Sequence, residues 1–164
     1  MHEKSIELLN RAVADELAAV NQYMYFHIHL DDQGYDPLSK MFKRIAIQEM
    51  GHVETLAERI LFLKGDVLMK AGHDVSPVQD VAAMLEMARG MEEGSARDYN
   101  LWANECSANA DASTKKIFEQ LVADEEGHFG QFDNELRKVQ VYGERYLALQ
   151  SIERIKVSAP AAAE

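Results

Sequence analysis

A short pattern of acidic and imidazole residues occurs twice in this chain of 164 residues. Each copy is a glutamate followed, 33 residues later, by a Glu-x-x-His motif. The two copies comprise Glu16, Glu49 and His52, and Glu92, Glu125 and His128. Because carboxylates and imidazoles are common metal ligands, the chain carries the same candidate half-site twice.

All six residues fall where a helical pattern calls for a buried aliphatic side chain. Apolar residues recur around them in steps of three and four, which marks one face of a helix. The four inward stripes are Leu9, Val13, Glu16, Val20 and Tyr23; Ile45, Glu49, His52 and Leu56; Val81, Leu85, Ala88, Glu92 and Tyr99; and Phe118, Leu121, Glu125, His128 and Phe132. The sequence therefore predicts four helices that direct the six polar side chains into one core.

Four carboxylates and two imidazoles in one core need a positive partner. Burying each ion without one would cost several kcal/mol, which a small domain cannot absorb. Two metal cations supply that charge, and one Glu from each of two helices with Glu-x-x-His from the other two is the ligand set of ferritin-like di-iron and di-manganese bundles. The i, i+3 spacing lets Glu and His reach the same metal.

The alternative is that these are ordinary surface residues, since an isolated Glu-x-x-His is a weak motif on a solvated helix. Two copies in phase with four apolar stripes favour the metal interpretation. Glu93 and Glu126 lie beside the candidate ligands but point about 100° away from the stripe. We expect these two glutamates to face solvent or to surround the ligands.

The predicted fold class is all-α, a ferritin-like four-helix bundle with one long crossover and a short fifth C-terminal helix. Long helices are expected at residues 5–32, 37–64, 76–108 and 114–142, with Ser5 as a candidate N-cap, and the fifth helix at 144–155. Residues 66–77 lack periodicity and form the crossover. We expect one domain at residues 1–157 and a disordered tail at 158–164.

Composition excludes several other classes. The single cysteine, Cys106, forbids an internal disulfide or a Cys-x-x-Cys module, and its helical spacing from Tyr99 and Trp102 predicts a buried thiol. A net charge of −11 argues against a nucleic-acid partner and suits a protein that attracts cations. Without an 18-residue apolar run or a signal-peptide core, no membrane partner is expected, and the expected location is the cytoplasm.

A second apolar line on the second helix lies apart from the candidate ligands. It consists of Ile47, Met50, Ala57 and Leu61, with Glu54 interrupting it. A helix that is apolar on two sides is buried on two sides, and one bundle accounts for only one of them. Self-association through this line is therefore one prediction, and scattered surface aliphatics are the alternative.

The ligand set, its order and the chain length together resemble the bacterioferritins, over residues 3–155. The segments that carry the resemblance are DELAAVNQY at 15–23, EMGH at 49–52, RILFLKG at 59–65 and DEEGH at 124–128. The resemblance implies a homo-oligomeric cage of 24 subunits built from dimers. Such a cage oxidises Fe(II) with oxygen or peroxide at an intrasubunit di-iron centre and stores Fe(III) as a mineral.

The resemblance also implies roles for individual residues. Glu16 and His52 with bridging Glu49 would hold one iron, and Glu92 and His128 with bridging Glu125 would hold the other. Met50 corresponds to the methionine that ligates haem b at the interface of paired subunits, and Tyr23 would lie close to the di-iron centre.

The chain departs from the family pattern in one respect. Some members carry His and Asp on the cavity side of the second helix, where this chain has Arg44 and Gln48, so an inner-surface iron relay of that kind is not supported. His27 continues the inward stripe about 16 Å from Glu16 and is expected to be a hydrogen-bonded core histidine. No role is assigned to His29.

Three other functions remain open from the sequence. A rubrerythrin-like peroxidase uses a similar ligand set, but its members usually bring a rubredoxin module that one cysteine cannot form. A manganese catalase-like enzyme accepts the same ligands. A metal-free scaffold is the third, and the buried carboxylates argue against it.

Overall fold

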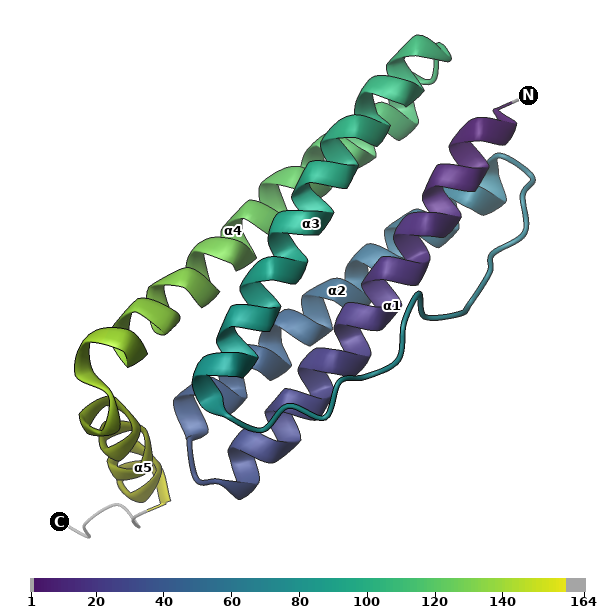
Figure 1. The fold of residues 1–164 in the computed structure, drawn as a ribbon. Helices are drawn as coiled ribbons and strands as arrows, with labels where there is room; N and C mark the ends of the chain where they lie inside the picture. The colour runs from purple at the N-terminus through teal and green to yellow at the C-terminus, as the bar shows by residue number, and fades with distance from the viewer. Residues whose placement is uncertain (1, 159–164) are drawn as a thin grey trace, which may run out of the picture.

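Five helices and one long crossover make up the structure, a computed structural model that describes residues 2–158 (Figure 1). The helices are α1 (Glu3–Asp32), α2 (Asp36–Phe62), α3 (Val81–Ala108), α4 (Ala112–Tyr142) and α5 (Glu144–Ser158). α1 pairs with α2 and α3 pairs with α4, while α5 lies across one end of the bundle. No strand occurs within residues 2–158, so the predicted all-α bundle is confirmed. In this same range, every helix is too short or too polar to span a membrane.

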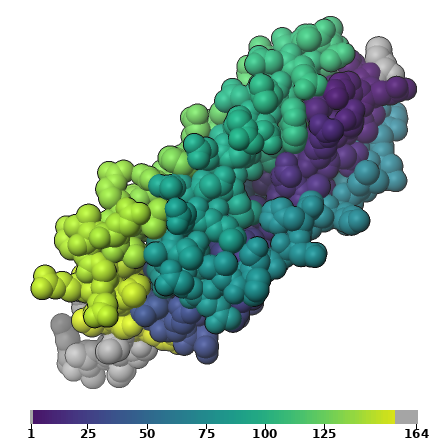
Figure 2. Space-filling model, in the orientation of Figure 1, coloured from purple at the N-terminus to yellow at the C-terminus, as the bar shows by residue number. Residues whose placement is uncertain are grey.

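The crossover between α2 and α3 runs back along α1, as the sequence predicts (Figures 1 and 2). Asn10 of α1 anchors the start of the crossover. The Asn10 side-chain amide donates to the Asp66 carbonyl at 3.0 Å and accepts from the Leu68 N–H at 2.8 Å. Further along, the Gly72 N–H donates to the Ala14 carbonyl at 2.9 Å. These bonds satisfy the backbone of a segment that has no regular structure.

Two predicted helix starts are wrong. α3 begins at Val81 and not at residue 76, because Gln22 bonds both the N–H and the carbonyl of Ser76 and the Asp80 carboxylate caps the Ala83 N–H at 2.9 Å. α1 begins at Glu3, and Ser5 is not its N-cap. The Ser5 hydroxyl is buried inside α1, 3.8 Å from the Cys106 sulfur.

The end of α2 requires a glycine. α2 ends at Phe62, after which Lys64 adopts a φ of 65°. A Cβ at Gly65 would lie 2.7 Å from Cγ2 of Ile6, so any other residue at this point would have to displace the Ile6 side chain. At the other terminus α5 continues to Ser158, three residues beyond the expected end, and residues 159–164 of the expected tail lie outside the described residues.

Two apolar layers fill the bundle. One contains Tyr23, Phe26, Phe42 and Phe132, and the other contains Leu56, Tyr99, Trp102, Phe118 and Cys106, which is buried as predicted. On each long helix the candidate ligands lie between the residues of the two layers. Val20 is the exception to the predicted stripes, because it is half-buried on the outer side of α1 while Ala19 and Tyr23 take the inward positions.

A buried ion pair fixes the start of α4. The Arg59 guanidinium lies 2.7 Å from Oδ1 of Asp111, which also accepts from the Thr114 N–H at 3.1 Å as the N-cap of the helix. Burial opposes ionisation, but the hydrogen bonds from Thr114 and the charge of Arg59 prevail and lower the pKa of Asp111 to about 2. The ionised carboxylate therefore stabilises the fold above pH about 4, and this contribution is lost as the pH falls through about 2.

We expect Asp111→Ala to lower the free energy of unfolding by about 3 kcal/mol, because it removes a helix cap and leaves a nearly buried guanidinium unpaired. Asp80→Ala is the matched control, since Asp80 caps α3 in the same way but forms no ion pair with an arginine within residues 2–158. It should cost about 1 kcal/mol. Urea unfolding followed by circular dichroism measures both, and equal losses would show that the ion pair contributes nothing.

Candidate dinuclear metal centre

The structure brings the six predicted residues together in the middle of the bundle. All are buried, from Glu49 at 0% exposure to His52 at 9%. They form two overlapping sets whose ligand atoms lie within 4.8 Å of one another. One set is Glu16, Glu49, His52 and Glu125, and the other is Glu49, Glu92, Glu125 and His128. Glu49 and Glu125 belong to both sets, so each could offer a carboxylate oxygen to either of two metal positions.

Both imidazoles present Nδ1 to the carboxylates. Nδ1 of His52 lies 2.8 Å from Oε2 of Glu49 and 3.2 Å from Oε1 of Glu125. Nδ1 of His128 lies 3.0 Å from the other Glu49 oxygen and 3.7 Å from the other Glu125 oxygen. The terminal glutamates complete the pattern, since Glu16 and Glu92 each lie 3.5 Å from Nδ1 of one histidine.

Six buried polar atoms that face this space have no hydrogen-bond partner among residues 2–158. They are both carboxylate oxygens of Glu49, one each of Glu92 and Glu125, and Nδ1 of His52 and His128. Each buried polar atom without a partner costs about 1–3 kcal/mol, so a group of six marks a place for a ligand. Oxygen and nitrogen donors without a thiolate match iron or manganese. These residues therefore fit a pair of such ions.

The charges of the six residues compensate one another when no metal is bound. Burial and the nearby Glu125 raise the pKa of Glu16 well above its usual value, and they do the same for Glu92. Burial lowers the pKa of His128, but its close contacts with the carboxylates of Glu125, Glu49 and Glu92 prevail and raise it to about 12. Protons thus occupy the centre, and a metal ion that binds there displaces them.

Two tyrosines orient the terminal glutamates. The Tyr99 hydroxyl donates to Oε1 of Glu16 at 2.6 Å, and the Tyr23 hydroxyl donates to Oε1 of Glu92. Tyr23 lies beside the centre as the resemblance implied, whereas the role of Tyr99 was not recognised in the sequence. The sequence does contain a signal for both tyrosines, because each of them follows a terminal glutamate by seven residues. Each bond crosses between α1 and α3.

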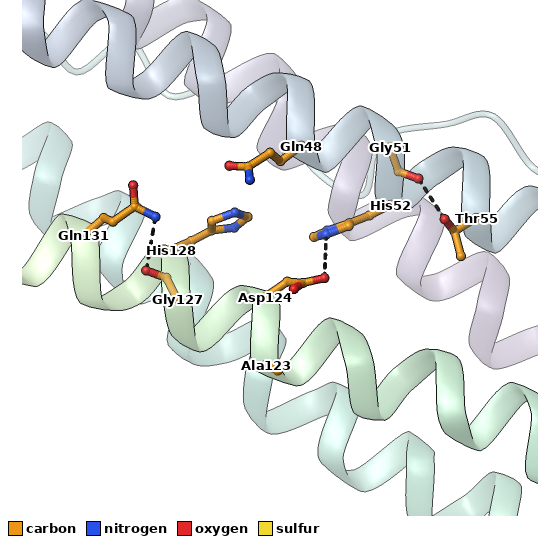
Figure 3. A pocket seen from close by; sticks show the side chains of 9 residues that line it. All are labelled: Gln48, Gly51, His52, Thr55, Ala123, Asp124, Gly127, His128 and Gln131. Carbon is orange, nitrogen blue, oxygen red and sulfur yellow. Dashed lines mark hydrogen bonds and ion pairs between the residues drawn. The ribbon is translucent and has the colours of Figure 1, made fainter.

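Two hollows reach the centre from opposite helix pairs. The larger, about 520 Å³, lies between α2 and α4 and exposes one edge of both histidines (Figure 3). The smaller, about 180 Å³, lies between α1 and α3 and is lined by Glu16, Glu92 and Glu125 together with Gly90 and Gly94. Small ions and molecules therefore have two approaches to the metal ligands.

The other residues singled out in the sequence lie outside the centre. Met50 and Ile47 are each 54% exposed, and they line a hollow of about 630 Å³ on the outer side of α1 and α2. Glu93 and Glu126 are exposed, as expected. Nδ1 of His27 lies 2.8 Å from the Ser39 hydroxyl, so this half-buried histidine is hydrogen-bonded as predicted.

Comparisons of sequence place this chain among known proteins. The family described as ferritin-like domain matches residues 6–141. The bacterioferritin of Desulfovibrio desulfuricans is 35% identical over 88% of this chain and 81% of its own length. That of Brucella melitensis is 34% identical over 86% of this chain and 88% of its own length.

Comparisons of structure agree. A crystal structure of the Desulfovibrio desulfuricans bacterioferritin, which describes its diiron site in different catalytic states, superposes with a TM-score of 0.88 at 33% identity, covering 98% of this chain and 93% of that one. The structure of the Rhodobacter capsulatus bacterioferritin has a metal-free dinuclear site and a haem iron in a crystallographic special position. It also superposes with a TM-score of 0.88, at 29% identity, covering 100% of this chain and 99% of that one.

Proposed function

The chain belongs to the bacterioferritin family of ferritin-like proteins, and from this membership we propose that it is an iron storage protein which oxidises Fe(II) at a di-iron ferroxidase centre. The observation that carries the proposal is the double membership of Glu49 and Glu125 in the two ligand sets. The rubrerythrin-like alternative is not favoured, because the two relatives described above, which match 88% and 86% of this chain, are bacterioferritins.

Each ligand has a proposed role at this centre. One iron would be held by Glu16 and His52 and the other by Glu92 and His128, and Glu49 and Glu125 would be shared between them. The geometry supports this division, because the two ligand sets share only the two proposed bridges. When bound, the iron ions supply the electrons that reduce oxygen or peroxide.

The chain's own residues hold and insulate the irons. Four carboxylates offset the charge of two Fe(II) ions, so binding leaves no net charge in the core. Hydrogen bonds from Tyr99 and Tyr23 fix the rotamers of the terminal glutamates before metal arrives, which lowers the cost of ordering them. The apolar layers on either side of the centre limit the access of water.

Assembly into a cage of 24 subunits built from dimers is the second part of the proposal. Family membership supports an oligomeric cage. The exposed side chains of Ile47, Met50 and Leu61 on α2 provide an apolar surface for the contact within a dimer. In a two-fold contact through this surface, two copies of Met50 face each other, and their sulfurs can ligate a single haem.

Oxidation of Fe(II) by the assembled protein should occur in two phases. The first saturates at two irons per chain, when the ligand sets are filled, and the second continues more slowly as mineral accumulates. Stopped-flow absorbance measures the phases, and electron microscopy shows the shell and its iron core. Oxidation that ends at two irons per chain, with no core, would favour an oxidase that stores nothing.

A further inference from the structure

The hollow between α2 and α4 shows a difference between the two halves of the metal centre. The residue immediately before the proposed bridging glutamate differs between the halves. It is Gln48 before Glu49 and Asp124 before Glu125. Both residues line the hollow with His52 and His128 (Figure 3). The repeat that supplies identical ligands to both metal positions therefore supplies different neighbours.

Asp124 contacts the histidine of the opposite helix. Its Oδ2 lies 3.4 Å from Nε2 of His52, the ring nitrogen that faces away from the other ligands. The other oxygen, Oδ1, accepts a hydrogen bond at 3.1 Å from Nε2 of Gln120, one turn earlier on α4. Gln120 thus orients the carboxylate toward His52.

Gln48 occupies the corresponding place beside His128. Figure 3 shows its side chain directed toward the His128 ring. Its amide is uncharged, and among residues 2–158 no carboxylate lies within ion-pair distance of Nε2 of His128. One imidazole therefore has a carboxylate close to its outer nitrogen, while the other shares the hollow with an uncharged amide.

A carboxylate at the outer nitrogen strengthens a metal-bound imidazole. It accepts the Nε2 proton, which keeps Nδ1 free for the metal, fixes the ring orientation and makes the ring more basic. Loss of such a partner typically lowers metal affinity about ten- to a hundredfold. A neutral amide oxygen accepts the same proton more weakly, since hydrogen bonds to ionised acceptors are roughly twice as strong.

We propose that Asp124 makes the two metal positions unequal, so that the position of Glu16 and His52 binds a divalent cation more tightly than the position of Glu92 and His128. Asp124 acts here as a positioning residue, because it contacts the ligand and not the metal. The inference rests on the proposed dinuclear function and adds an order of filling to it. The Glu92 and His128 position is then the one that fills last and empties first.

Titration of the assembled, metal-free protein with Co(II) tests the proposal, using calorimetry for affinity and visible absorbance for coordination. Wild-type protein should show two steps whose dissociation constants differ by about tenfold or more. Asp124→Asn should weaken the tighter step by about tenfold and leave the weaker step within about twofold. Gln48→Asp should strengthen the weaker step instead, and the protein with both substitutions should fill its positions in the reverse order.

Two further measurements make the result specific. Glu126→Gln removes an exposed charge from the same helix and should move neither step beyond about twofold, because only a local contact is expected to matter. Crystals with one equivalent of Zn(II) per chain should show anomalous density at Glu16 and His52. Density divided equally between the positions, or equal weakening of both steps by Asp124→Asn, would overturn the proposal.

Failure of this inference is distinguishable from failure of the proposed function. Two equivalents of Co(II) that bind with equal affinity would leave the dinuclear centre intact and remove only the inequality. Uptake that stops at one equivalent per chain in wild-type protein would instead contradict the dinuclear centre itself. Gln48→Asp introduces a negative charge at an exposed position, so it tests the inference even if Asp124→Asn fails to fold.

Discussion

Both metal ions should be lost when either Glu49 or Glu125 is replaced by alanine. Each carboxylate belongs to both ligand sets, so one substitution removes a ligand from each metal and the negative charge that separates them. Substitution of Glu16 or Glu92, by contrast, should affect mainly one position. Metal analysis after saturation with Fe(II) measures the stoichiometry, and the rapid phase of oxidation should disappear with the second metal.

Glu126→Ala is the control, because Glu126 adjoins Glu125 on α4 but is exposed. It should bind two irons per chain and oxidise them at the wild-type rate. Circular dichroism and size-exclusion chromatography establish that the variants remain folded and assembled. If Glu49→Ala or Glu125→Ala retained one tightly bound iron, that carboxylate would be a terminal ligand and not a bridge.

Haem absorbance should disappear in Met50→Leu, while assembly and Fe(II) oxidation remain close to wild type. The substitution keeps the apolar volume of the side chain and removes the sulfur that the proposal assigns as an axial ligand. Met50 is 54% exposed and lies on the outer side of α2, so the metal centre is not disturbed. Reconstitution with haem followed by visible spectroscopy measures the effect.

Met69→Leu is the matched control, since Met69 is the other methionine that lines the same hollow. It should retain the haem spectrum. Haem that persists in Met50→Leu and disappears in Met69→Leu would move the axial ligand to the crossover. A wild-type protein that takes up no haem at all would leave Met50 as an apolar contact of the dimer.

The arrangement of the four long helices could be predicted because each carries an apolar stripe of about three to five turns that is interrupted only by the candidate ligands. Where α3 begins could not be predicted. Ser76 and Pro77 resemble a helix start, but the non-helical conformation there depends on Gln22, which lies far away in sequence. The assignment of Val20 failed for a similar reason, since a periodic pattern alone does not distinguish the edge of a buried face from its centre.

The site could be predicted further than the fold, because a buried carboxylate is costly and its presence in an apolar stripe is informative. All six predicted residues converge in the structure. Contacts between side chains on different helices could not be predicted from the sequence. The hydrogen bond of Tyr99 with Glu16 and the contact of Asp124 with His52 depend on how the two helix pairs face each other, which no spacing within one helix records.

The two tyrosine bonds make each half of the chain incomplete without the other. Tyr23 in the first helical hairpin holds Glu92 of the second, and Tyr99 in the second holds Glu16 of the first. A hairpin on its own would therefore supply only three of the six candidate ligands, and its tyrosine hydroxyl would lack the glutamate to which it donates. The same reciprocity means that two identical hairpins related by a two-fold axis would satisfy every one of these contacts. The ligands and tyrosines of the centre therefore have the symmetry of a dimer of two identical hairpins, although they belong to one polypeptide. The crossover is the segment that joins the two hairpins.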